Sequence, residues 1–540
     1  MSSSTAQQPV QDTNFASALS DDASGQQNGR QHYGSLPTTS PSEALSAPKP
    51  TAVSTRAISP DLLRGLILPL MSLDHAALFM GAWLHGTPRQ TENAGTPMHE
   101  WNFTSAYVSR TITHLCAPGF FFLMGMGTVY FHKSRKRIGW GEGRMVKHFV
   151  IRAVALTLVS EVMGETLMWG RGVWLINIVL IGLAVDYLLT GLLCVMLEET
   201  DKLVLRGLDK LSAGKADGQR RPLLDNANAE QQNDTSAASP RSQSLSFWIH
   251  NVLLLILTYI TIFWNIWLSP THGHCSATAT HPSSSTPIEL LALQPLTSAS
   301  PPPPPSPSSA WGPWFDFWFC PVQNRFVMSG FPPLAWLSFS IFGLLYARVM
   351  LYKKWSPSAV IVGNLFTAVI LSALFVATRL LHFGNLSEGC LHMPEHLAHP
   401  DKNQYLVSIR SFFYITKYPP SPSFFALTMA VNFALLAFFS AIPPTIATKI
   451  PGLMNYGGSA LFFYVAHMYL YALLSIPARH FFEHDLPDHP PNNWEKTKGL
   501  GPTAPLWITW VLGLVILSPL CRLYGKIKAT KGPDSLWRFF

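Results

Sequence analysis

The stretch that decides the fold is LLRGLILPLMSLDHAALFMGAW, which runs from Leu62 to Trp83. A helix of this length can cross the roughly 30 Å hydrocarbon core of a bilayer. The stretch is apolar except for Arg64 near its start and the adjacent pair Asp74 and His75 inside it. Because ionisable side chains are costly in hydrocarbon, the pair marks a functional site by default.

Similar apolar runs recur along the chain, which has 540 residues, 48% of them hydrophobic and only 13% charged. Average soluble domains carry about 25% charged residues. About ten runs are long enough to span a bilayer, so we predict an all-α, polytopic membrane helix bundle with about ten transmembrane helices. The runs are Leu62–Trp83, Tyr107–Phe131, Met145–Met168, Val173–Leu197, Phe247–Leu268, Phe331–Leu351, Ala359–Leu381, Ser423–Ile442, Tyr456–Pro477 and Pro505–Tyr524.

Basic residues are concentrated in a connection, a short turn and the C-terminal tail, and an even number of spans places these three segments on the same side as the N-terminal tail. Positive residues favour the cytosol, so we expect the N- and C-termini to be cytosolic. The same bias accounts for the net charge of +8 without a nucleic-acid partner. The residues are Lys133, Arg135, Lys136, Arg137, Arg144 and Lys147; Lys353 and Lys354; and Lys526, Lys528, Lys531 and Arg538.

Three segments are too polar or too rich in Ser and Pro to form a packed core, and we expect them to be disordered or loop-like. No secretory signal is expected at the start of the chain. The predicted order is a disordered cytosolic tail (1–55), spans one to four (56–197), a disordered cytosolic loop (198–246), span five (247–268), a Pro/Ser-rich extracytosolic loop (269–330), spans six to ten (331–524) and a cytosolic tail (525–540).

The predicted extracytosolic loops hold cysteines and glycosylation sequons. One disulfide can form among Cys275, Cys320 and Cys390, and the sequence does not choose the pair. The sequons Asn102-Phe103-Thr104 and Asn385-Leu386-Ser387 lie on the same side.

Arg64 and His75 are eleven residues apart, close to three helical turns, so they share one stripe about 16 Å long. This stripe links a cation at the cytosolic edge to a buried base. Alternatively, Arg64 only snorkels to the membrane surface and His75 makes an ordinary interhelical hydrogen bond. Asp74 diverges from His75 by about 100° around the helix, so we expect it to pair with another helix.

Two further histidines lie in apolar runs at a depth similar to that of His75. His114 shares a helix face with Arg110 and Pro118, and the proline is expected to loosen the helix there. His467 lies in a stripe with Tyr464 and Tyr471. We interpret the three histidines as lining one cavity; the alternative is three unrelated packing histidines.

Two other charged residues have open interpretations. Glu161, near the extracytosolic end of the third span, either lines the same cavity or meets lipid headgroups. Lys417 either contacts a ligand or anchors the eighth span at the interface. The sequence His480-Phe-Phe-Glu483-His484 matches a zinc-protease pattern but occurs in a short loop, and we predict no metal site.

Several motifs in fixed order resemble the heparan-α-glucosaminide N-acetyltransferase-like family, in its less characterised branch with an Asp-His pair in the first span. The resemblance covers residues 56 to 477 without the insertions. It rests on Arg56-Ala-Ile-Ser-Pro-Asp-Leu-Leu-Arg64-Gly with Met71-Ser-Leu-Asp74-His75, on Ile112-Thr-His114-Leu-Cys-Ala-Pro118, on Thr416-Lys417-Tyr-Pro-Pro-Ser421 and on Leu461-Phe-Phe-Tyr464-Val-Ala-His467.

The resemblance implies a transmembrane acyltransferase that takes acetyl from cytosolic acetyl-CoA and passes it to a glycan or another hydroxyl or amine acceptor. We therefore expect acyl-CoA, a glycan acceptor and the lipid bilayer as partners, in the ER, Golgi, a vacuole-like organelle or the plasma membrane. The alternatives are a proton-coupled transporter and a non-catalytic membrane protein.

The expected roles divide among ten residues. His75 or His114 acts as the general base or carries the acyl group, Asp74 orients or charge-stabilises a histidine, and His467 with Tyr464 stabilises an oxyanion. The expected binding residues are Arg64 and Arg56 for the phosphates of CoA, and Glu161, Arg110, Tyr464 and Lys417 for the acceptor.

Overall fold

The computed structural model describes residues 58–83, 94–167, 175–177, 179–217, 240–275, 312–323, 327–447, 449–486 and 498–532. The chain divides into two units, Met1–Thr55 and Arg56–Phe540. The first unit, which contains the predicted N-terminal tail, lies outside the described residues. All described residues therefore belong to the second unit.

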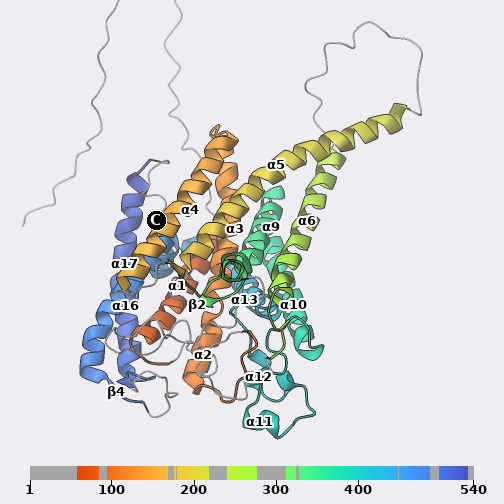
Figure 1. Cartoon of the computed structure of the whole chain (residues 1–540). Coiled ribbons are helices and arrows are strands. Elements are labelled where there is room, and N and C mark those ends of the chain that lie inside the picture. The colour runs from red at the N-terminus through yellow and green to blue at the C-terminus, as the bar shows by residue number, and fades with distance from the viewer. Residues whose placement is uncertain are drawn as a thin grey trace, which may run out of the picture. The chain divides into compact units, whose positions relative to one another are not determined.

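Long helices dominate the described part of the chain (Figure 1). They are α1 (Ile58–Phe79), α2 (Thr104–Thr113), α3 (Cys116–Arg137), α4 (Glu142–Leu167), α5 (Leu180–Asp217), α6 (Pro240–Trp267), α9 (Leu337–Tyr352), α10 (Pro357–Leu380), α13 (Pro422–Ala441), α16 (Ala460–Phe482) and α17 (Ala504–Thr530).

Nine helical stretches of the described residues, with α2 and α3 counted as one, are long and apolar enough to cross a membrane. The protein is therefore an all-α, polytopic, integral membrane protein, as predicted. The remaining predicted span is α4, which is helical but more polar because it carries Arg152, Glu161 and Glu165.

The shorter elements connect these helices. They are α8 (Pro313–Phe319), α11 (Pro394–Leu397), α12 (Ile409–Phe413), α14 (Pro444–Ala447), α15 (Pro451–Gly458), the 3₁₀ turns Pro333–Trp336 and Gln404–Leu406, and the strands β1 (Leu175–Asn177), β2 (Val322–Gln323), β3 (Val327–Ser329), β4 (His484–Asp485) and β5 (Lys498–Gly499). Strand β3 pairs in parallel with β1 and antiparallel with β2, and β4 pairs antiparallel with β5.

The core between the helices is aromatic and closely packed. Trp336 is fully buried and stacks on Phe121 and Phe331, with ring centroids 5.4 and 5.1 Å away. Helices α3 and α9 approach so closely that a Cβ added at Gly125 would lie 1.9 Å from the carbonyl oxygen of Ser340. Small residues at helix contacts allow such approach inside a membrane.

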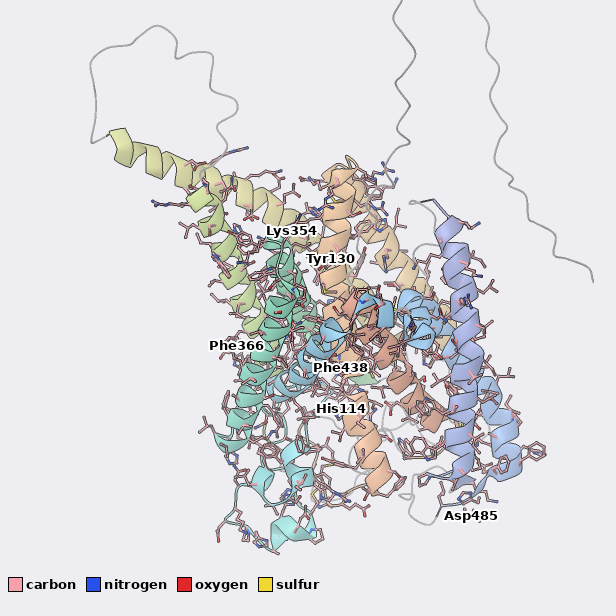
Figure 2. The ribbon with its side chains drawn as sticks, turned by 180° about the vertical axis from the view of Figure 1, so that it is seen from behind. His114, Tyr130, Lys354, Phe366, Phe438 and Asp485 are labelled. Atoms are coloured by element: carbon pink, nitrogen blue, oxygen red, sulfur yellow. The ribbon has the colours of Figure 1, made fainter. Side chains whose placement is uncertain are left out.

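The outward face of α10 is apolar and exposed. Val362, Phe366 and Val369 are 63%, 66% and 65% exposed, and Figure 2 shows Phe366 on the outside of the helices. A contiguous apolar surface of this kind is unfavourable in water and suits contact with lipid.

Ion pairs connect one end of each of five helices, and we call this region the basic end. Lys136 of α3 lies 3.2 Å from Glu142 of α4 and 3.1 Å from Glu198 of α5. Asp201 of α5 lies 3.2 Å from Arg348 of α9 and 2.8 Å from His250 of α6. Lys133 also donates to Leu351 O at 3.5 Å, so two of the segments predicted to share the cytosolic side, those after α3 and after α9, lie together.

Backbone hydrogen bonds connect the segments 94–103, 269–275 and 381–421 at the opposite ends of the helices, and we call this region the loop end. Met98 N donates to Cys390 O over 2.7 Å, and Ala94 N donates to Tyr418 O over 3.1 Å. Helix α6 adds Asn265, whose side-chain amide donates to Ala335 O and Pro420 O. These bonds hold the segment before α13 in place.

The structure corrects four predicted boundaries. The second span is broken at His114 and Leu115 into α2 and α3. Residues 198–217 and 240–246 are helical parts of α5 and α6 rather than disordered loop, residues 313–319 form α8 within the predicted extracytosolic loop, and α17 continues to Thr530.

The long extension of α5, which projects beyond its neighbours in Figure 1, has a local cause. Lys202 pairs with Glu199 at 2.5 Å and lies 3.8 Å from Glu198, at the three- and four-residue spacings that stabilise helices. The prediction of a disordered loop at residues 198–246 rested on composition and did not take these pairs into account.

Candidate functional site

Two predicted histidines from distant parts of the chain meet between α1 and α16. The Nδ1 atom of His75 lies 2.7 Å from the Nε2 atom of His467, and the rings stack with centroids 5.0 Å apart. His467 is fully buried, whereas His75 keeps part of its surface accessible between the buried residues Asp74 and Ala76. The accessible member of the pair is therefore His75.

The partners of His467 define which nitrogens carry protons. Its Nδ1 atom lies 2.9 Å from the carbonyl oxygen of Phe463, which can only accept a hydrogen bond. Nδ1 of His467 therefore carries the proton, and its Nε2 accepts from Nδ1–H of His75. In the neutral pair, the lone pair of His75 then resides on Nε2, which is the nitrogen of a general base.

Asp74 pairs with another helix, as predicted. Its carboxylate forms a buried ion pair with the guanidinium of Arg110, which α2 presents. Two opposite charges that are buried together stabilise one another. Removal of either would leave the other charge buried without a partner of opposite sign, which is costly. Arg110, predicted to contact the acceptor, is instead fully buried against Asp74.

His114 lies where α2 ends and α3 begins, two residues before Cys116. It caps α2 and packs edge-on against Phe424 of α13, with centroids 5.5 Å apart. Figure 2 shows it in the interior, between the levels of Lys354 and Asp485. The expected loosening near Pro118 is present as the break between α2 and α3 at His114 and Leu115, where Leu115 O accepts both from Gly119 N at 3.1 Å and from the side-chain amide of Asn432 at 3.3 Å.

Lys417 lies in the loop-end segment before α13 and is buried. Its ammonium is 5.0 Å from the ring centroid of Tyr418 and 5.7 Å from that of Phe331. Its charge and that of Arg110 both act on His75. The alternative of an interfacial anchor does not fit this buried ammonium, whose field reaches the histidine pair.

Tyr464 and Tyr471 flank His467 on α16. The Tyr464 ring lies 5.6 Å from that of His467, and within the described residues its buried hydroxyl has no hydrogen-bond partner. Buried hydroxyls are nearly always satisfied, so such an atom is available to a bound molecule. Tyr471 instead donates to Trp510 O of α17 at 2.8 Å, and Trp510 donates to Ser72 of α1 at 3.1 Å.

The remaining predicted residues lie elsewhere. Glu161 accepts weakly from Ile176 N of β1 at 3.4 Å and so supports the small sheet. Arg64 pairs with Asp61 at 3.1 Å and donates to Gly457 O at 3.4 Å. Because Arg64 contacts α15 and His75 contacts α16, the predicted stripe of α1 does face one continuous segment. Arg56 lies outside the described residues.

One charged residue was missed. Asp186 of α5 is fully buried, and its Oδ2 accepts from the hydroxyl of Ser340 at 3.3 Å. Its other carboxyl oxygen has no hydrogen-bond partner within the described residues. Asp186 is the only acid in the run Val173–Leu197, and the cost of an ionisable group in hydrocarbon marks it as it marks Asp74.

Comparison with known proteins adds no relative: no protein-family model matches the chain, and no curated protein matches it. The function is therefore inferred from the residues of the site itself. A directed histidine pair, two nearby cations and an available hydroxyl are suited to moving a proton while negative charge develops on a substrate.

Proposed function

We propose that this protein is an integral membrane acyltransferase that moves an acetyl or other acyl group from cytosolic acyl-CoA to a hydroxyl or amine acceptor, such as a glycan. The observation that carries the proposal is the directed hydrogen bond from Nδ1 of His75 to Nε2 of His467. It leaves a base on the accessible histidine. The ordered motifs that resemble known acyltransferases support the same reaction class.

The proposed reaction begins at Nε2 of His75. This atom takes the proton of the acceptor hydroxyl or amine while the acceptor oxygen or nitrogen attacks the thioester carbon. The tetrahedral intermediate collapses, the C–S bond breaks, and the imidazolium returns the proton to the CoA thiolate. His75 Nδ1–H keeps donating to His467 throughout, so the pair remains oriented.

The charges around the pair suit the intermediate. Lys417 and Arg110 both act electrostatically on His75. Negative charge develops on the carbonyl oxygen during the attack, and preorganised positive groups and donors stabilise it. The Tyr464 hydroxyl is a further donor within the same aromatic cluster. In this arrangement Arg110, whose charge is balanced by Asp74, stabilises the intermediate through its electric field and does not contact it directly.

The acyl donor is proposed to approach from the end of α1 that carries Arg64. Arg64 lies on the same face of α1 as His75 and its side chain is 22% exposed. Arginine recognises phosphate through paired donors, so Arg64 is suited to a phosphate of CoA. A donor held there would lie along α1, with its thioester directed towards the histidines about 16 Å away.

The test is acyl-CoA binding and turnover by the purified full chain in detergent or nanodiscs. We expect hydrolysis or transfer that a His75→Ala/His467→Ala double variant abolishes. His480→Ala is the matched control, because His480 is exposed and lies on the same helix as His467. No binding of any acyl-CoA, or full turnover by the double variant, would overturn the proposal.

A second function, proton-coupled transport, is favoured by Asp186. An acid buried in the middle of an apolar helix suits a proton relay. Substrate accumulation in proteoliposomes, driven by a pH gradient and lost in Asp186→Asn, would support this function. The acyltransferase predicts no such flux.

A further inference from the structure

Two of the three cysteines predicted to lie outside the cytosol meet at the loop end. Cys275 follows α6, and Cys390 lies in the loop after α10. The backbone N–H of Cys275 donates to Glu388 O at 2.9 Å, and His274 bridges to Glu388 in parallel. Backbone bonds thus bring the two cysteines together, although 115 positions separate them.

The side chains also meet. Cys390 is fully buried, and its Sγ atom lies 3.9 Å from the carbonyl oxygen of Glu388, the same oxygen that accepts from the backbone N–H of Cys275. Cys275 Sγ additionally lies 3.4 Å from the carbonyl oxygen of Gly95. Thiols that paired backbone holds close together in this way need only a small movement to reach the S–S bond length of about 2 Å.

The environment does not suit a catalytic thiol at this place. The hydrogen bond with Cys275, together with burial, raises the pKa of the Cys390 thiol far above its usual range. A reactive cysteine needs the opposite, because the thiolate is the nucleophile. A buried, paired and unreactive thiol is what the reduced form of a structural disulfide presents.

Cys320 provides the contrast. It lies between α8 and β2, where its backbone N–H donates to Asp316 O at 2.7 Å. Burial, and then the charge of Asp316, raise the pKa of Cys320 to about 12. Among the described residues, the contacts of Cys320 involve this local segment and neither of the other two cysteines.

We propose that Cys275 and Cys390 form a disulfide bond in the mature protein. The positive-inside pattern places the loop end away from the cytosol, where disulfides form and persist. In the bond-forming step each thiol loses a proton, an S–S bond forms, and two electrons reduce the disulfide of a thiol–disulfide oxidoreductase to its dithiol.

The bond would stabilise the loop end next to the segment that carries Lys417. Cys275 touches Gly95, and the adjacent Ala94 donates to Tyr418 O at 3.1 Å. Tyr418 follows Lys417, the buried cation that acts on His75. The disulfide would therefore join the segment after α6 to the loop after α10, next to the Gly95–Ala94 backbone that bonds to Tyr418, without taking part in the chemistry.

Peptide mapping of the unmodified protein tests the proposal directly. The full chain, expressed in secretory-pathway membranes, is denatured in acid, alkylated with N-ethylmaleimide and digested without reductant. We expect a linked peptide pair containing Cys275 and Cys390 that separates on reduction. Alkylation of both cysteines, or a link from either one to Cys320, would overturn the proposal.

Thiol counting with a maleimide–polyethylene glycol supplies an independent readout. The denatured, unreduced protein should label at four sites, the six cysteines less the bonded two. Cys275→Ser should release Cys390 and raise the count to five, whereas the control Cys320→Ser should lower it to three. Six labelled sites in the unreduced wild type would contradict the bond. If Cys275→Ser fails to fold, peptide mapping of the wild type still tests the bond.

Discussion

Nδ1 of His75 on α1 and Nε2 of His467 on α16 lie 2.7 Å apart, although 392 positions separate these residues. The carbonyl oxygen of Phe463 orients the second histidine, and the second histidine orients the first. This order makes His75 the base and His467 the positioning residue, which gives the two substitutions different expected effects.

His75→Gln should lose the base while its side-chain amide still donates to His467. Loss of a general base typically lowers the rate about 10²- to 10⁴-fold. We therefore expect acyl transfer to fall by that order, with the acyl-CoA dissociation constant unchanged. Single-turnover kinetics and equilibrium binding measure the two quantities separately, and equal losses in both would point to misfolding instead.

Substitutions of Asp74 and Arg110 should have strongly coupled effects on the free energy of unfolding. Asp74→Asn or Arg110→Met alone leaves an uncompensated buried charge, which costs about 3–5 kcal/mol. The double variant removes both charges and should be less destabilised than the sum of the single variants. Thermal unfolding in one detergent checks the cycle; strictly additive losses would show that the pair does not interact.

Much of the fold was predictable because hydrocarbon imposes length and polarity on each span. The same cost predicted that Asp74 needs a partner from another helix. It did not identify Arg110, because the choice among neighbouring helices depends on packing. Depth along a helix likewise placed His75, His114 and His467 at one level, but only the packing of α16 on α1 selected His467 as the contact of His75.

The break between α2 and α3 shows a second limit. Pro118 signalled a loosened helix, whereas the break lies at His114 and Leu115. A proline weakens the bond to the residue four positions earlier, so the disturbance appears one turn upstream. Asn432 of α13 donates a second hydrogen bond to the Leu115 carbonyl, beside the bond from Gly119 N, and the local sequence does not predict this contact.

Neither sequon is expected to carry a glycan in the folded protein. A glycan attaches to the amide nitrogen of asparagine. The amide nitrogen of Asn385 donates to Thr378 O at 3.0 Å and to Glu388 Oε1 at 2.6 Å, and Asn102 is buried. Glycosidase treatment should therefore leave the mass unchanged. Asn385→Gln should destabilise the loop end by about 1–3 kcal/mol, because buried groups lose their partners; a glycosidase-sensitive mass would refute this prediction.

Two nearby glycines on different faces of α3 should respond in opposite ways to alanine. A Cβ at Gly125 would lie 1.9 Å from Ser340 O of α9, whereas a Cβ at Gly127 would meet nothing within 4 Å. Gly125→Ala should push α3 and α9 apart and lower the unfolding temperature. Gly127→Ala should be neutral or stabilising by up to about 1 kcal/mol, since alanine favours helix. Equal tolerance of both substitutions would show that the helices are not packed this closely.

The loop end should lose stability in acid through His392. Burial, and then the neighbouring His99 and His396, lower the pKa of His392 below its usual value of 6.5. Below pH 6.5 the unfolded chain therefore binds a proton more readily than the folded one, so the contribution to stability is full above that pH and declines as the pH falls through the lowered value. The unfolding temperature should thus drop between pH 7.5 and 5.5, and His392→Gln should reduce the drop. His399→Gln, an exposed histidine of the same loop, is the control and should keep the wild-type drop; an unchanged drop in His392→Gln would assign the pH dependence to other groups.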